Sequence, residues 1–283
     1  MTAAHTSVVV GVGPGDRQTT ALACAVGEAE RRGAPLRIVH ATGAPAQGTD
    51  LYISDAMLAE LRDEGQKVLD DVKHLLDETA PSATVSYVLH ASDVVDALML
   101  EGATASVLIV GADDIPWPER LLGGAVAAYV ARHAPCPVVV VPEHTSPTPL
   151  FGGIVVALDG ETAATGPLRF AFEEARIGDH ELHALYATRA GAITHDPGRV
   201  QATVGEVLAG WSEQFPDVHV LRHFALDTPE EACVRASSQA ELLVMGRPHD
   251  RGLPAGWSRG LALKVLRHAW CPVAIVPADY RGA

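Results

Sequence analysis

Residues 132–138 read RHAPCPV, and residues 267–273 read RHAWCPV. The two stretches lie 135 residues apart, and Gly111 and Gly246, which each close an apolar run, keep the same spacing. A period of this length is far longer than the unit of a solenoid. The pair of stretches therefore predicts a domain that occurs twice in the chain.

The N-terminal parts of the two halves match at a second offset. Residues 9–12 (VVGV) correspond to residues 155–158 (VVAL), and Ala41 corresponds to Ala187, an offset of 146. The second half is therefore 11 residues shorter between positions 41 and 81. Because that interval holds the polar, glycine-containing stretch 43–50, we expect the difference to lie in a loop and part of a helix.

A proline-rich stretch joins the halves. Pro142, Pro147 and Pro149 occur within eight residues that show no helical or strand periodicity, which indicates a short, stiff linker. We predict a first domain over residues 1–143, a linker over 144–150 and a second domain over 151–283.

Short apolar runs alternate with helical patterns in both halves. The predicted strands are residues 8–12, 36–41, 85–89, 107–110 and 138–141, then 154–158, 182–187, 218–224, 242–245 and 273–276. Continuous rather than alternating apolar runs indicate strands that are buried on both faces. The sequence predicts an α/β fold: two doubly wound, five-stranded parallel sheets in tandem.

Composition limits the function classes. With 21 basic and 35 acidic residues the net charge is −14, so we expect no general nucleic-acid binding. No apolar run approaches the length of a bilayer span, and the N-terminus lacks a signal-type core, so we expect no membrane insertion and a cytoplasmic location. The four cysteines form no CxxC pair, which argues against a zinc site or a disulfide framework.

Ligands of such sheets bind at the carboxyl ends of the strands, where the strand order reverses. The loops after the predicted first and fourth strands would form this crevice. The loop after the fourth strand spans residues 111–125 in the first half and 246–260 in the second, and each leads into a helix N-terminus. Free backbone amides and the helix dipole at such a position suit a phosphate group.

Both halves resemble the universal stress protein family, whose fold is that of the adenine nucleotide α-hydrolases. The family's nucleotide motif is Gly, two residues, Gly, nine residues, Gly, and then Ser or Thr, and the RHAPCPV segment is also typical of it. In the first half Gly111 and Gly124 fit the first and third glycines, whereas Asp114 and Ala125 replace the second glycine and the Ser/Thr. Gly13 stands where ATP-binding members carry an aspartate at the end of the first strand.

The second half departs from the motif at other positions. Asp159 fits the aspartate and Gly246 the first glycine, whereas His249 replaces the second glycine and Arg259-Gly260 replaces the final pair. Arg247 lies in the same loop, so an anion could be held there. We expect instead an internal ion pair of Arg259 that closes this site, with Asp250 of the same loop among the candidate partners. Strand ends complete the candidate nucleotide-binding set with Val12, Ala41, Leu158 and Ala187.

The sequence gives little support for an enzymatic function. Gly11, Gly13 and Gly15 suggest a dinucleotide loop, but Asp16 breaks the pattern and no acidic residue closes the second strand. A Walker lysine motif, a nucleophile elbow and catalytically spaced carboxylates are all missing from the sequence. We therefore predict no catalytic residues, no metal ligands and at most slow ATP hydrolysis.

Two functions remain open. The resemblance implies a regulatory protein that binds ATP, with Mg²⁺, through altered motifs. The alternative is a scaffold without nucleotide that acts by dimerisation and by docking an unidentified protein. The family's tandem members resemble a dimer in one chain, so we expect strands 138–141 and 273–276 to pair as a pseudo-dimer, with a further homodimer also open.

Overall fold

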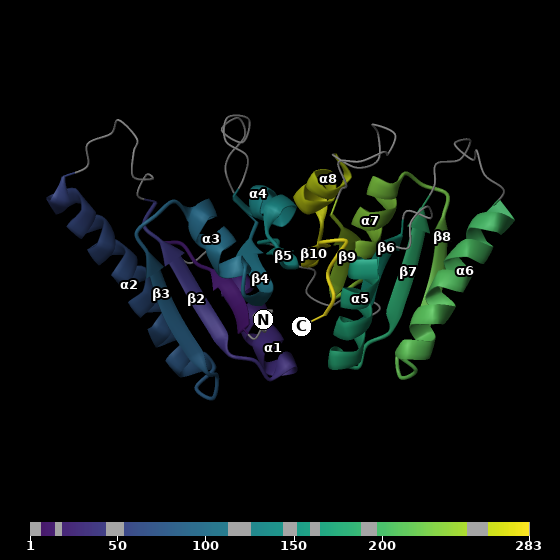
Figure 1. The fold of residues 1–283 in the computed structure, drawn as a ribbon, viewed down its shortest axis with the longest axis horizontal. Coiled ribbons are helices and arrows are strands. Elements are labelled where there is room, and N and C mark those ends of the chain that lie inside the picture. The colour runs from purple at the N-terminus through teal and green to yellow at the C-terminus, as the bar shows by residue number, and fades with distance from the viewer. Residues whose placement is uncertain are drawn as a thin grey trace. The chain divides into compact units, whose positions relative to one another are not determined.

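The computed structural model describes residues 7–14, 19–43, 54–112, 126–143, 152–158, 165–187, 197–247 and 260–282. The chain divides into two compact units between residues 143 and 144 (Figure 1). Among the described residues, no helix combines the length and the apolar character needed to cross a bilayer.

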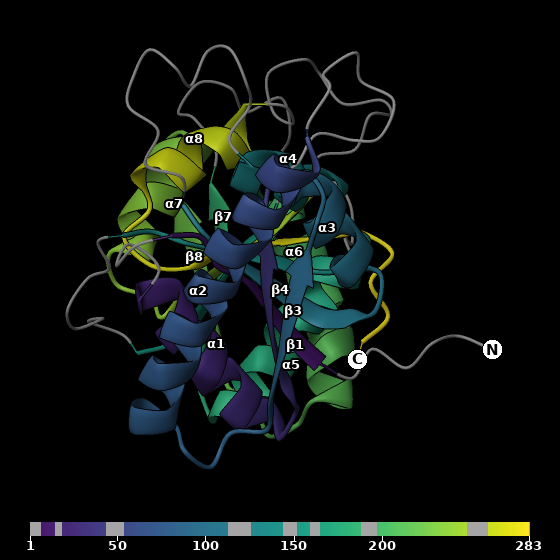
Figure 2. The same cartoon turned by 90° about the vertical axis from the view of Figure 1, so that its left-hand side faces the viewer.

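The described part of unit one contains five parallel strands and four helices. Its strands are β1 (Ser7–Gly11), β2 (Leu36–Ala41), β3 (Val85–His90), β4 (Ala105–Gly111) and β5 (Val138–Val141), in the order β3-β2-β1-β4-β5. Its helices are α1 (Thr19–Arg32), α2 (Asp55–Thr79), α3 (Val94–Gly102) and α4 (Val126–His133). Helices α1 and α2 cover one face of the sheet, and α3 and α4 cover the other (Figure 2).

Unit two repeats this arrangement. Its strands are β6 (Ile154–Leu158), β7 (Leu182–Ala187), β8 (Val220–Ala225), β9 (Leu242–Gly246) and β10 (Val273–Val276), in the order β8-β7-β6-β9-β10. Its helices are α5 (Thr165–Gly178), α6 (Pro197–Gln214), α7 (Pro229–Ser237) and α8 (Leu261–His268). The predicted fold class, two doubly wound five-stranded parallel sheets, is confirmed.

The strands differ in burial between the centre and the outside of each sheet. The apolar residues of β1 and β4 are almost completely buried, as their continuous apolar runs predict. On the outer strand β8, by contrast, Arg222, His223 and Phe224 are exposed. The strand also begins at Val220 and not at the predicted Val218. Val218 lies in a turn, where its backbone N–H donates to the carbonyl of Phe215.

The length difference between the halves lies in the predicted interval, in the second helix and the connection before it. Helix α2 has 25 residues and its counterpart α6 has 18, and the rest of the difference falls in the connection before the helix. The helices correspond at their C-terminal ends, where Leu69 and Leu76 of α2 and Val204 and Trp211 of α6 are all buried. The additional residues therefore extend α2 at its N-terminus, beginning at the N-cap Ser54.

The segment after β10 packs on the first turns of α5. Gly166 donates its backbone N–H to the carbonyl of Ala278 at 3.1 Å. The hydroxyl of Tyr280 donates to Glu173 at 2.9 Å, and its ring meets the buried ring of Phe170 edge to face. A Cβ at Gly166 would lie 2.0 Å from the carbonyl oxygen of Pro277, so only glycine lets the segment approach this closely.

Three of the four cysteines, Cys136, Cys233 and Cys271, are buried. Burial raises the pKa of both the Cys233 and the Cys271 thiol to about 12. These two side chains are therefore neutral near pH 7 and pack as small apolar groups.

Candidate functional site

The strand order reverses between β1 and β4 in unit one and between β6 and β9 in unit two. At the first of these points Val12 and Gly13 follow β1, beside Gly111 at the end of the paired strand β4. At the second, Leu158 ends β6 and Gly246 ends β9. Parallel strands bring their carboxyl ends to one edge of the sheet, so each unit has a candidate crevice there.

Only part of the predicted site lies within the described residues. The described candidates are Val12, Gly13, Ala41, Gly111, Leu158, Ala187, Gly246, Arg247 and Gly260. Ala41 and Ala187 end the neighbouring strands β2 and β7. The remaining candidates, and the expected ion pair of Arg259, lie outside the described residues: Asp114, Gly124, Ala125, Asp159, His249 and Arg259.

A buried histidine holds the turn after β1. The backbone N–H of Val12 donates to the carbonyl of Val39 at 2.9 Å. The carbonyl of Val12 accepts from Nδ1 of His40 at 2.8 Å, so His40 carries its proton on Nδ1. His40 fits beside Gly65 of α2, where a Cβ would lie 3.1 Å from its ring. These bonds fix the direction in which the chain enters the crevice at Gly13.

The glycines at the crevice are not required by packing against the described residues. A Cβ at Gly111 would meet only Ala21, at an ordinary 3.9 Å, and one at Gly260 would have none of the described atoms within 4 Å. At Gly246 the fit is closer, because Pro167 of α5 would lie 3.2 Å away. The described residues therefore do not fill the space beside Gly111 and Gly260, where a ligand could approach the backbone.

The backbone at this edge is tied to neighbouring strands. Ala112 donates to the carbonyl of Val141 at 2.7 Å, and Arg247 donates to that of Val276 at 2.8 Å. Lys264 donates to the carbonyl of Gly260 at 3.0 Å, which starts helix α8. Gly260 itself has no side chain to cap the amides of that first turn.

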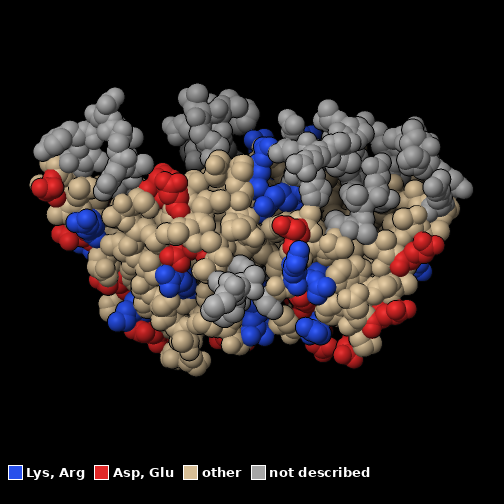
Figure 3. Space-filling model, viewed as in Figure 1, with Lys and Arg blue, Asp and Glu red and all other residues tan. Residues whose placement is uncertain are grey.

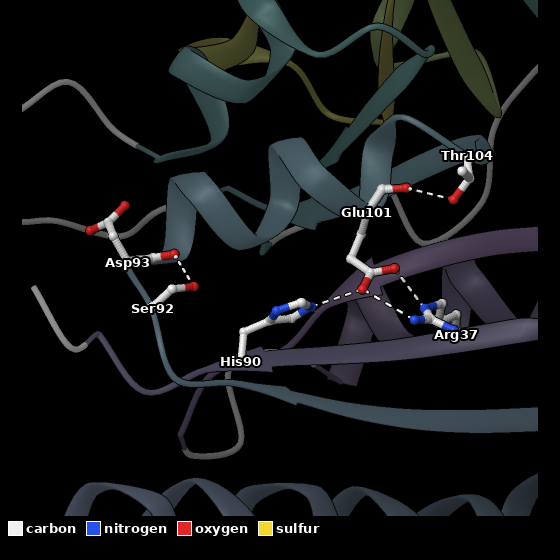
Figure 4. A network of polar contacts seen from close by, with 6 residues as sticks. All are labelled: Arg37, His90, Ser92, Asp93, Glu101 and Thr104. Carbon is white, nitrogen blue, oxygen red and sulfur yellow. Dashed lines mark hydrogen bonds and ion pairs between the residues drawn. The ribbon is translucent and has the colours of Figure 1, made fainter. Parts of the chain in front are cut away.

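An ion-pair network joins Arg37, His90 and Glu101 in unit one (Figure 4), and His90 pairs with Ala41 at the end of β2. The carboxylate of Glu101 on α3 accepts from Nε of Arg37 at 2.6 Å and from Nη2 at 3.2 Å. It also accepts from Nε2 of His90, the last residue of β3, at 2.8 Å. The carbonyl of His90 in turn accepts from the backbone N–H of Thr42, the residue after β2, so the network is linked to the chain where it leaves β2.

Glu101 is ionised in this network. Burial opposes its ionisation, but the hydrogen bonds from Arg37 and His90 outweigh that cost, and the pKa of Glu101 is lowered. The positions of Glu101 and Arg37 correspond to Ala236 and His183 in unit two, which therefore lacks this network.

The described part of the crevice is suited to non-covalent binding. It offers backbone groups, glycines and small apolar side chains at the strand ends. Among the described residues, no group of three or more His, Cys, Asp or Glu side chains is placed to hold a metal ion. On the face shown in Figure 3, basic and acidic side chains both occur on each unit, singly or in small groups.

Comparison with known proteins identifies the family. The model of the universal stress protein family matches the chain twice, over residues 5–142 and 151–277. The chain belongs to the universal stress protein family. Both matches fall on the duplicated halves, so the predicted tandem arrangement of two universal stress protein domains is confirmed.

Curated universal stress proteins resemble the chain along most of its length. One from Mycobacterium tuberculosis is 30% identical over 264 residues, which cover 88% of each chain. A second from the same organism is 28% identical over 277 residues and covers 93% of each. The crystal structure of a universal stress protein from Archaeoglobus fulgidus has a TM-score of 0.74 at 18% identity and covers 99% of this chain and 97% of its own. That structure has the same fold.

Proposed function

We propose that this universal stress protein is a regulatory protein that binds an adenine nucleotide, ATP with Mg²⁺, in the crevices at the reversal of strand order. In each unit a glycine ends the fourth strand beside the end of the first strand. In unit one the glycine's missing Cβ leaves room beside the backbone. This placement supports the proposal, since open α/β sheets take nucleotides at this point.

The two sites are unequal in this proposal. Unit two keeps an aspartate at position 159, which would bind the ribose and base side of the nucleotide. Unit one has Gly13 there, and Asp114 would lie near the phosphates, where its charge would repel them unless Mg²⁺ lies between. Unit two would therefore be the stronger site, although closure by an ion pair of Arg259 would weaken it.

Calorimetric titration with ATP and Mg²⁺ tests this ranking. Asp159→Ala removes a charged hydrogen-bond acceptor for the ligand, so we expect about 10- to 100-fold weaker binding. Asp114→Gly removes repulsion and should leave affinity unchanged or raise it. Asp159→Asn serves as the matched control that keeps the shape of the side chain. A larger loss in Asp114→Gly than in Asp159→Ala would contradict the ranking.

The alternative function is a scaffold that binds no nucleotide. It is favoured by the substitutions at six motif positions: Gly13, Asp114, Ala125, His249, Arg259 and Gly260. Absence of any ATP-dependent heat in the wild-type titration, together with no nucleotide released by acid from the purified protein, would support the scaffold and reject nucleotide binding.

Both functions predict the same assembly within the chain. Strands β5 and β10 are each the last strand of their unit and consist of apolar residues, and apolar sheet edges need cover. We expect them to pair across a pseudo-twofold axis. Small-angle scattering should then fit one compact particle, and a profile of two independently tumbling units would contradict the pairing.

A further inference from the structure

Two imidazoles lie against each other on the outer strands of unit two. Nδ1 of His183 on β7 is 2.9 Å from Nε2 of His223 on β8, and the rings stack at 18° with centroids 5.1 Å apart. His183 is 5% exposed and fits against Gly153, where a Cβ would lie 3.0 Å from its Nε2. At this distance one ring nitrogen donates and the other accepts. The hydrogen bond therefore exists only while one of the two facing nitrogens is unprotonated.

The charged groups around the pair favour its neutral form at His183. Burial is the largest influence and lowers the pKa of His183, and the charge of His223 lowers it further. Glu181 acts in the opposite direction, but its carboxylate is 4.0 Å from Nε2 of His183 and accepts from the exposed His219 at 2.9 Å. A second proton on the pair would place two cations within hydrogen-bond distance.

Charged residues of α7, which packs against β7, make contacts of their own. Their partners are Lys264 for Glu230, Asp227 for Arg235 and Thr228 for Glu231. The electrostatics of the pair are thus set by His219, Glu181 and the two imidazoles themselves.

Unit one secures the corresponding strands in a different way. The position of His183 is occupied there by Arg37, which is bound to the ionised Glu101 (Figure 4). A guanidinium keeps its charge at every pH that the protein meets, so this contact is insensitive to pH near neutrality. In unit two the helix offers Ala236 in place of the carboxylate, and the strands are joined instead by the two imidazoles of His183 and His223.

We propose that the His183–His223 pair is a proton-sensitive contact that holds the outer strand β8 on β7 at neutral pH and releases it on acidification. The sign follows from the lowered pKa of His183: the unfolded or opened state takes up a proton more readily than the closed one. The stabilisation is complete above the ordinary pKa of 6.5 and is lost as the pH falls below it. Opening would begin at β8, because this strand has a neighbour on one side only.

Hydrogen exchange on the full-length protein tests whether the His183–His223 contact holds β8 in this pH-dependent way. Protection factors, which remove the intrinsic effect of pH on exchange, are compared between about pH 7.5 and about pH 5. We expect β8 to lose about tenfold more protection than β3 over this range, with β3 as the internal reference. His183→Gln keeps an amide that can hydrogen-bond to His223 but does not titrate, and it should abolish the difference.

Two further variants keep the result unambiguous. His223→Gln changes the exposed partner and should also abolish the difference, so it decides the matter if His183→Gln fails to fold. His133→Gln alters an exposed histidine of α4, whose Nδ1 bonds to the carbonyl of Tyr129, and should respond like the wild type. Equal loss of protection in β3 and β8, or a wild-type response in His223→Gln, would overturn the proposal.

Discussion

Replacing Glu101 with alanine should lower the free energy of unfolding of unit one by about 2–3 kcal/mol. Glu101 is 6% exposed, and its carboxylate accepts hydrogen bonds from both Arg37 and His90. Its removal leaves these donors without their acceptor. Because the Arg37 side chain is 38% exposed, water compensates part of the loss, and the expected effect lies below that of a fully buried ion pair.

The loss should also depend on pH. The folded-state pKa of Glu101 is lowered, so its charge stabilises the fold above the ordinary value of 4.5 and ceases to do so as the pH falls through the lowered value. The difference between wild type and Glu101→Ala should therefore be constant near neutrality and shrink in acid. Urea unfolding followed by hydrogen exchange of β2 and β3 measures it in unit one alone.

Glu60→Ala is the matched control for this experiment. Glu60 is an exposed residue of α2, and its replacement should change stability by less than about 0.5 kcal/mol. Glu101→Gln should fall between the two, since the amide keeps one acceptor and loses the charge. A change in Glu101→Ala no larger than that in Glu60→Ala would contradict the role of the network.

Gly166→Ala should destabilise unit two by about 1–3 kcal/mol. A Cβ at this position would lie 2.0 Å from the carbonyl oxygen of Pro277 and 2.8 Å from that of Ala278. Backbone atoms cannot rotate out of the way, so the segment after β10 would have to leave the first turn of α5. The bonds of Ala278 to Gly166 and of Tyr280 to Glu173 would be lost with it.

Thermal unfolding measures the loss of stability, and chymotrypsin cleavage at Tyr280 measures the release of the segment after β10. The same substitution elsewhere provides the control: Gly210 lies inside α6, and an added Cβ there would have none of the described atoms within 4 Å. Gly210→Ala should raise stability by about 0.5–1 kcal/mol, because alanine favours a helix more than glycine does. A variant Gly166→Ala as stable and as resistant to cleavage as the wild type would refute the close approach.

The fold was predictable because each strand of the centre carries its own signal. Residues 36–41 and 182–187 are mostly apolar and form β2 and β7 with the predicted bounds. Burial on both faces removes the need for alternation, which makes such runs easy to recognise. The outer strand β8 was less well defined, because exposed Arg222 and His223 interrupt its apolar character.

The supports of the candidate site were not predictable from the sequence. Arg37 and Glu101 are 64 residues apart, and no local pattern connects them. A charged residue within an apolar strand, as at Arg37, signals that a buried partner exists, but the fold alone decides which carboxylate that is. The role of His40 was equally unpredictable, since its partner is the backbone carbonyl of Val12 and not a side chain. The roles assigned to Asp114, Asp159 and Arg259 stay predictions.

The N-terminal extension of α2 lengthens the helix without adding buried contacts to the sheet. Its first residues, Asp55 to Met57, are exposed, and Met57 retains 53% of its accessible surface. The buried contacts of the helix begin only at Gly65. A helix end that buries little is held mainly by its own backbone bonds and its cap, and such an end opens at a low free-energy cost. The first turns of α2 can therefore fray and re-form while the sheet below Leu69 and Leu76 stays intact.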